Sequence, residues 1–142
     1  MIFNFIVKRF HFLTKVPLLV HLFDAILLFN SFLFRRQRFK IICSLEEELM
    51  AWKGIQFSRH HYGGMQINYE KKELGHIHGN GLLDVHVGSG NKEYCIQNLH
   101  CENHHILDDS NAWVSFWIRE KEDFEKALQL LSFVYEKAGM KN

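Results

Sequence analysis

The stretch from Glu73 to Asp84 concentrates residue types that carry chemistry. It reads Glu73-Leu74-Gly75-His76-Ile77-His78-Gly79-Asn80-Gly81-Leu82-Leu83-Asp84. Imidazole nitrogens and carboxylate oxygens bind transition metals, and both groups exchange protons with ligands. Residues i and i+2 of a β-strand share a face, so His76 and His78 should point the same way. We therefore expect the functional site of the protein to lie on this stretch.

The turn after His78 decides which acid joins the histidines. Gly79-Asn80-Gly81 is typical of a hairpin turn, because Asn and Gly tolerate the left-handed conformation. A three-residue loop places His76 opposite Asp84, whereas a two-residue turn at Asn80-Gly81 removes Asp84 from the histidine face. We favour the three-residue loop, because it leaves the apolar side chains of the second strand for the core: Leu83, Val85 and Val87.

A metal site is the first interpretation of this face. His76 and His78, with His104 as a third ligand, could bind a divalent transition metal such as zinc or iron. The carboxylate of Glu73 or Asp84 is a further possible ligand. Adjacent His104 and His105 point to opposite faces of a strand, so at most one of them should reach the site.

Two other interpretations need no metal. In a small-molecule pocket, Asp84 would orient His76 for acid–base chemistry, and Arg59 would hold an anionic ligand. In a purely structural hairpin, the glycines allow close backbone approach and the histidines bond to the backbone. The candidate ligand-binding residues are Arg59, Glu73, His76, His78, Asp84, His104, His105, Ser110 and Trp113.

The surrounding pattern predicts the elements that position these side chains. Alternating apolar residues and turn signals predict strands over 55–61, 65–69, 74–78, 82–87, 104–107 and 113–119. Helical spacing predicts helices over 18–34, 44–54, 92–98 and 120–135. Strands grouped in hairpins with helices at the ends indicate an α+β fold: a mostly antiparallel sheet with helices packed on one side, preceded by an apolar N-terminal helical arm.

Charge divides the 142-residue chain into two parts. Residues 1–40 contain seven Lys and Arg side chains against Asp24 alone, whereas residues 41–142 contain ten basic and fifteen acidic side chains. We predict a basic helical arm over 1–40 and an α+β domain over 41–142. The acidic balance of the domain argues against a nucleic-acid partner.

Three interpretations of the arm stay open. A spanning helix would place Asp24 near its centre, at a cost of about 2.5–3.5 kcal/mol. An interfacial helix pair would put Lys and Arg at the headgroups of a membrane surface. Alternatively, the arm packs on the domain or on a second copy in a homo-oligomer. Three cysteines without a CxxC pair favour a cytoplasmic protein, with membrane association through the arm as a further possibility.

Several short motifs in this order resemble the luciferase-domain (DUF5519) family over about residues 52–137. They are Glu73-Leu74-Gly75-His76-Ile77-His78-Gly79, Leu82-Leu83-Asp84, His104-His105-Ile106-Leu107, Asp109-Ser110 and Trp113-Val114-Ser115-Phe116. The Ser110-Asn111-Ala112-Trp113 segment has one residue more than the Ser-Gly-Trp of many members. The resemblance implies a compact α+β domain and transfers no active site.

Together these observations predict a luciferase-like domain that binds a small molecule or a metal at the His-rich hairpin. The alternative is a non-catalytic interaction module, assembled or tethered to a membrane through residues 1–40. Whether the protein is an enzyme stays open at this stage.

Overall fold

The computed structural model describes residues 17–104, 107 and 111–140. Two helices come first, four strands follow, and a short helical segment separates them from the last strands and helix. In chain order the elements are α2 (Pro17–Phe34), α3 (Arg36–Met50), β1 (Ile55–Arg59), β2 (Met65–Tyr69), β3 (Lys72–Ile77), β4 (Leu82–His86), the 3₁₀ turn η2 (Ser89–Asn91), α4 (Lys92–Asn98), β5 (Glu102–Asn103), β6 (Trp113–Trp117) and α5 (Asp123–Gly139).

The strands form one sheet in the order β1-β2-β3-β4-β6-β5, and every neighbouring pair is antiparallel. The first four strands are consecutive hairpins. β6 then pairs with β4, and the two-residue β5 adds to the outer edge of β6. The predicted α+β class and antiparallel sheet are therefore confirmed.

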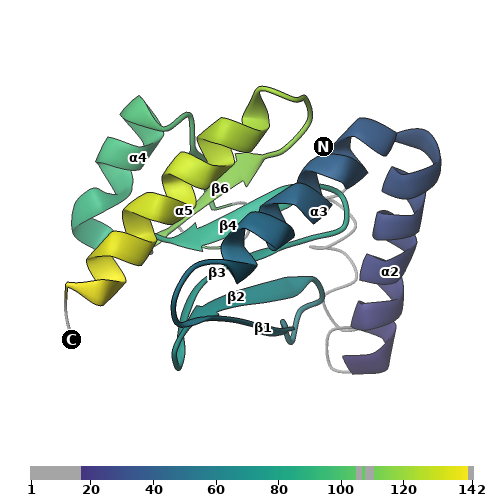
Figure 1. Ribbon diagram of the computed structural model, residues 1–142, viewed down its shortest axis with the longest axis horizontal. Coiled ribbons are helices and arrows are strands. Elements are labelled where there is room, and N and C mark those ends of the chain that lie inside the picture. Colours follow the sequence, from purple (N-terminus) through teal and green to yellow (C-terminus); the bar gives the residue numbers. More distant parts are fainter. Residues whose placement is uncertain (1–16, 105–106, 108–110, 141–142) are drawn as a thin grey trace.

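Helices α3 and α5 lie side by side across one face of the sheet (Figure 1). The sheet presents apolar side chains to them because alternate strand residues, among them Ile67, Val85 and Val114, turn to this face. α3 contributes Leu45 and Leu49 to the same core, and α5 contributes Ala127, Leu130, Leu131 and Val134. This face is the hydrophobic core of the domain.

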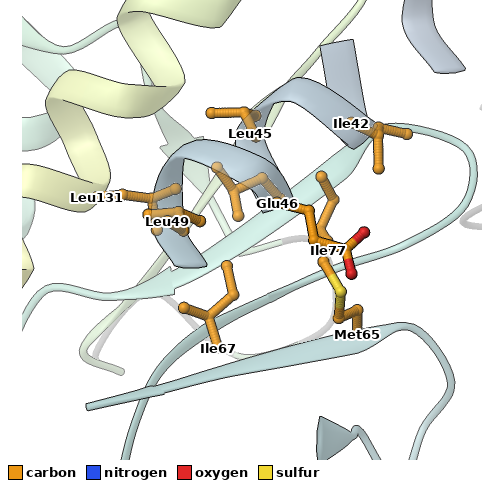
Figure 2. Close-up of a pocket in the computed structure, with 9 residues that line it drawn as sticks. Ile42, Leu45, Glu46, Leu49, Met65, Ile67, Ile77 and Leu131 are labelled. Carbon is orange, nitrogen blue, oxygen red and sulfur yellow. The ribbon is translucent and has the colours of Figure 1, made fainter. Parts of the chain in front are cut away.

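A narrow space remains between α3 and the strands beneath it (Figure 2). Leu45 and Leu49 line it from the helix, and Ile67 and Ile77 line it from the sheet. The space is large enough for about one water molecule. It is therefore a packing gap of the core, too small for an organic ligand.

Helix α2 leads into α3, contacts it near the turn at Arg35, and runs beyond one end of the strands (Figure 1). It packs on the turns that join the strands at that end. A Cβ atom at Gly79 would come within 2.5 Å of Leu28 N and 2.8 Å of Asp24 O. Only glycine allows the β3–β4 turn to approach the α2 backbone this closely.

Several predicted boundaries differ from the structure, among them those of the last helix, which was predicted over 120–135 and is Asp123–Gly139. The helix predicted to begin at Ser44 begins at Arg36, because its buried side chains already start at Ile41, and the chain turns at Arg35. The short strand before β6 is Glu102–Asn103 rather than 104–107, of which residues 105–106 lie outside the described chain. The division into parts at residue 40 stays a prediction, although that residue lies inside α3.

Within the described ranges, no single helix has both the length and the hydropathy needed to cross a membrane. α2 and α3 meet these criteria only together, and the pair is bent by 119°.

Candidate functional site

The β3–β4 hairpin has the predicted register. His76 pairs with Asp84, and Gly75 and Ile77 pair with Val85 and Leu83. The His78 amide donates to the carbonyl of Leu82 at 2.8 Å, so the loop between them has three residues. The three-residue loop is therefore confirmed, and Asp84 lies on the same face as the two histidines.

A β-bulge brings Glu73 to this face as well. Strand β2 pairs Ile67 with Gly75 but Asn68 with Glu73, so one extra residue, Leu74, is inserted in β3. Without the bulge, Glu73 and His76 would point to opposite faces, because their spacing is odd. With it, Leu74 turns into the core and Glu73 lies beside His76.

His76, His78 and Asp84 converge at the centre of the face opposite the core. Oδ2 of Asp84 lies 3.5 Å from Nε2 of His76 and 3.8 Å from Nε2 of His78. The Asp84 side chain is fully buried, and those of both histidines are at most 10% exposed. We call these three side chains the His-Asp centre.

In each member of the His-Asp centre, the polar atom that points away from the centre contacts a further polar group. Nδ1 of His76 lies 2.9 Å from Oε1 of Glu73, and Nδ1 of His78 lies 3.5 Å from Oδ1 of Asp24 in α2. The Ser115 hydroxyl on β6 donates to Oδ1 of Asp84 at 2.5 Å. The two Nε2 atoms and Oδ2 of Asp84 therefore all point inward.

Helix α2 also fixes the turn that carries His78. Oδ1 of Asp24 accepts the Gly79 amide at 2.9 Å, and the Ser31 hydroxyl donates to the Gly79 carbonyl at 2.7 Å. Ser31 is buried, although it lies in an apolar helix. The polar strip of α2 is thus used to position the hairpin.

His104 reaches the centre in a different way. Its Nε2 lies 3.7 Å from Oδ2 of Asp84, but its Nδ1 accepts the Leu107 amide at 3.2 Å. A neutral imidazole that accepts at Nδ1 carries its proton on Nε2, so His104 presents an N–H to Asp84. The Trp113 ring lies 5.5 Å from that of His76 and 6.2 Å from that of His104, and it borders the centre on this side.

His60 stacks on the outer side of His76. The two rings are 3.7 Å apart and inclined by 9°, and Nε2 of His60 lies 3.7 Å from Oε1 of Glu73. Burial of His60, followed by the positive charge that His76 can carry, lowers the pKa of His60 to about 4. His60 is therefore neutral at physiological pH.

His76 has the opposite balance. Burial alone would lower its pKa, but its polar contacts with Asp84 and Glu73 and the negative charges of both outweigh burial and raise the pKa of His76 above its usual value. The pKa values of the two stacked imidazoles, His60 and His76, are thus shifted in opposite directions. The positive charge is favoured at His76 because its ring lies between the carboxylates of Glu73 and Asp84.

The structure brings together five of the candidate residues predicted from the sequence, and a sixth candidate, Trp113, borders them. Glu73, His76, His78, Asp84 and His104 meet within one cluster. Arg59 is in register with Met65 and Ile77, so it lies on the other face of the sheet from His76, and its role in ligand binding stays a prediction. His105 and Ser110 lie outside the described residues.

Three residues of the cluster were missed in the sequence. His60 follows β1 directly. The clustering of histidines in this part of the sequence was the only signal that could have assigned His60 to the site. Ser115 alternates with core residues Val114 and Phe116, which already placed it on the histidine face. Asp24 was noted only as a cost to a spanning helix, although an acid in an apolar helix also indicates a buried partner.

An antiparallel α+β domain with a buried histidine–carboxylate centre is the class that fold and site define. The family model described as Luciferase domain matches residues 71–134. The predicted resemblance is confirmed, and the narrower DUF5519 designation stays a prediction. The match begins just before Glu73 and ends within α5, so it includes the whole His-Asp centre but neither Asp24 nor His60. No curated protein and no solved structure matches the chain.

Proposed function

We propose that this domain binds a divalent transition metal through Nε2 of His76, Nε2 of His78 and Oδ2 of Asp84. One observation carries the proposal: each inward-pointing atom belongs to a side chain whose other polar atom is held by an outer group. Metal-binding histidines usually direct the second ring nitrogen to a carboxylate or carbonyl, which fixes tautomer and orientation. Glu73 takes this position for His76 at 2.9 Å, the Asp24 carboxylate lies 3.5 Å from Nδ1 of His78, and the Ser115 hydroxyl donates to Asp84.

The distances within the centre suit shared coordination better than direct hydrogen bonds. Hydrogen bonds between nitrogen and a carboxylate oxygen are about 2.7–3.2 Å long. Two ligands of one tetrahedral zinc lie about 3.4 Å apart, given zinc bonds of about 2.0–2.1 Å. The observed separations of 3.5 and 3.8 Å from Asp84 to His76 and His78 approach that value, and all three ligand atoms lie within 4.8 Å of one another.

The charges of the cluster also favour a cation. Asp24, Glu73 and Asp84 supply three carboxylates around largely buried imidazoles. In the absence of metal, a proton on His76 neutralises part of this charge, consistent with its raised pKa. A divalent ion bound at Nε2 would replace that proton and neutralise more of the negative charge.

The ligand set restricts the kind of metal. Two imidazoles and one carboxylate without thiolate suit zinc, iron(II) and related ions, and three protein ligands leave positions open for water or a small molecule. Asp84 takes the third position rather than His104, because the Nε2–H of His104 donates and cannot also bind a metal. His104 would instead hydrogen-bond the metal-bound carboxylate.

Metal content of purified full-length protein tests the proposal. Protein expressed with zinc or iron in the medium should retain close to one metal ion per chain, measured by mass spectrometry of the digested sample. The double variant His76→Ala/His78→Ala should retain none, whereas the control His21→Ala/His61→Ala, which removes two histidines outside the centre, should retain the wild-type amount. Metal-free wild-type protein that also fails to take up zinc or iron(II) on titration would contradict the proposal.

A further inference from the structure

The side of α2 that faces away from the hairpin is apolar along the whole helix. At about 100° per residue, Val20, Asp24 and Ser31 occupy one narrow strip, and this strip packs on the turns of the domain. The opposite side, an arc of about 140°, carries apolar side chains only. We define the outer face of α2 by its most prominent members, Leu18, Leu22, Ile26, Phe29 and Leu33; Phe32, at the edge of the arc, packs on Phe39 of α3.

This outer face is open to solvent in a way that is unusual for a folded domain. The exposed fractions of its side chains run from 43% at Leu33 to 76% at Leu18. Isolated exposed apolar residues are ordinary, but a contiguous apolar surface marks a site of interaction with a partner or a membrane. The helix therefore stabilises the hairpin with one side and leaves the other side for an external surface.

Exposed cations adjoin the end of this face. The chain turns from α2 into α3 directly after Phe34, and Arg35, Arg36 and Lys40 are exposed at this turn. We call these three residues the basic corner. Among the described residues, none of them forms an ion pair with a carboxylate, and Asp24, the one acid of α2, points to His78.

The next acids on α3 are farther from the corner. Glu46, Glu47 and Glu48 begin about 15 Å along the helix from Arg36 and about 9 Å from Lys40, at 1.5 Å per residue. The positive charge at the corner is thus not neutralised by its own helix. Apolar side chains beside clustered Arg and Lys are typical of helices that lie in the interface of an anionic membrane.

We propose that the outer face of α2 and the basic corner dock on the surface of an anionic phospholipid bilayer. The apolar side chains enter the boundary between headgroups and acyl chains, and the basic corner contacts lipid phosphates. The helix lies along the membrane rather than crossing it, because its polar strip is packed on the domain and lipid cannot surround it. A paired second copy would need only a narrow seam, whereas the apolar arc here is broad.

Docking would bring the His-Asp centre close to the lipid. Asp24, on the inner side of the same helix, contacts His78 and Gly79. Since a helix is about 10–12 Å across, the centre lies roughly one helix diameter from the docked surface. The inference does not depend on whether a metal is bound.

Vesicle flotation of the full-length protein tests this proposal. Wild type should float with vesicles of mixed phosphatidylcholine and phosphatidylglycerol and much less with phosphatidylcholine alone. The variant Leu22→Gln/Ile26→Gln/Phe29→Gln should lower the bound fraction at least about tenfold, because its apolar side chains no longer enter the interface. The control Met50→Gln/Met140→Gln, which changes exposed apolar residues elsewhere, should float like wild type.

Charge is tested separately with Arg35→Gln/Arg36→Gln/Lys40→Gln, which should remove the preference for anionic vesicles. Unfolding curves of all variants report that the fold is kept. Equal flotation of the wild type and the α2 triple variant would overturn the proposal, as would a wild type that binds no vesicles. A wild-type dimer that the triple variant converts to monomer, without vesicle binding, would instead assign the outer face to a second copy.

Discussion

The two faces of the sheet follow opposite rules. The face beneath α3 and α5 is closed by apolar side chains such as Leu83, Val85 and Val114, which are fully buried. The other face buries Asp84 just as completely, but surrounds it with imidazoles, a hydroxyl and further carboxylates. Burial of a charge is costly unless it is paired. The first face therefore accounts for stability, whereas the second has the composition that the proposed metal binding requires.

Alternation along β4 produces this division. Leu83 and Val85 turn to the helices, while Asp84 between them turns to the histidines. The bulge at Leu74 makes the same division in β3 and adds Glu73 to the polar face. If the comparison is right, substitutions on one face should change stability and leave metal binding intact, and substitutions on the other should do the reverse.

The largest expected effect is the loss of metal binding in Asp84→Asn. The amide is nearly isosteric and can still accept the Ser115 hydroxyl bond, but it removes the negative ligand. Zinc affinity should fall by more than the ~100-fold that is typical of changes outside the ligand set. Competition titration with a chromogenic chelator measures it. Wild-type affinity in this variant would exclude Asp84 as a ligand.

On the core face, Leu83→Ala should lower the free energy of unfolding by about 3 kcal/mol, because it opens a cavity beside fully buried neighbours. Urea denaturation of metal-free protein measures this change. Zinc stoichiometry should stay at the wild-type value. A loss of stoichiometry in folded Leu83→Ala protein would show that the two faces are not separable.

Acid should destabilise metal-free protein through His60. Its pKa is about 4 in the folded protein and ordinarily about 6.5, so between these values the unfolded chain binds more protons and stability falls as the pH falls. The raised pKa of His76 acts the other way, since its contribution is present at low pH and is lost as the pH rises through that pKa.

His60→Phe keeps a ring stacked on His76 and removes the titration. Between pH 7 and pH 4.5 the variant should lose less stability than wild type, by up to ~2 kcal/mol. Urea denaturation in the presence of a chelator measures both proteins. Identical pH dependence of the two would contradict a buried neutral His60.

The smallest effect on zinc affinity is expected at Glu73, which contacts the ligand His76 but is not itself a proposed ligand. Glu73→Gln keeps the shape of the side chain but weakens its hold on Nδ1 of His76, so zinc affinity should fall about 10- to 100-fold. The controls Glu47→Gln and Arg59→Gln lie outside the cluster and should leave the affinity unchanged. An affinity of Glu73→Gln equal to that of the controls would remove Glu73 from the site.

Much of this arrangement could be predicted from sequence, and the limits have physical causes. Period-two alternation and the Gly79-Asn80-Gly81 turn predicted the register that pairs His76 with Asp84, because side-chain direction in a hairpin is set locally. The bulge that redirects Glu73 has no comparable local signal. The contact of Asp24 with His78 spans 54 residues and depends on how α2 packs, which no periodicity specifies.

The position of Arg59 could not be predicted for a related reason. The residue lies at the end of β1, and its face is fixed by a register that passes through Met65 to Ile77 across two strand pairs. The sequence-based prediction placed Arg59 in a pocket with His76 because a guanidinium can bind the anionic part of a ligand. Sheet geometry separates them, because an odd offset places a side chain on the opposite face.

X-ray absorption at the zinc edge of the loaded full-length protein tests the central claim most directly. The His-Asp centre predicts nitrogen and oxygen ligands at about 2.0–2.1 Å, with the outer-shell signal of two imidazoles and no sulfur. The double variant His76→Ala/His78→Ala should retain no zinc at the centre, so zinc added to it should give a spectrum without the signal of two imidazoles. A sulfur ligand at about 2.3 Å, or a spectrum without imidazole, would contradict metal binding by His76, His78 and Asp84.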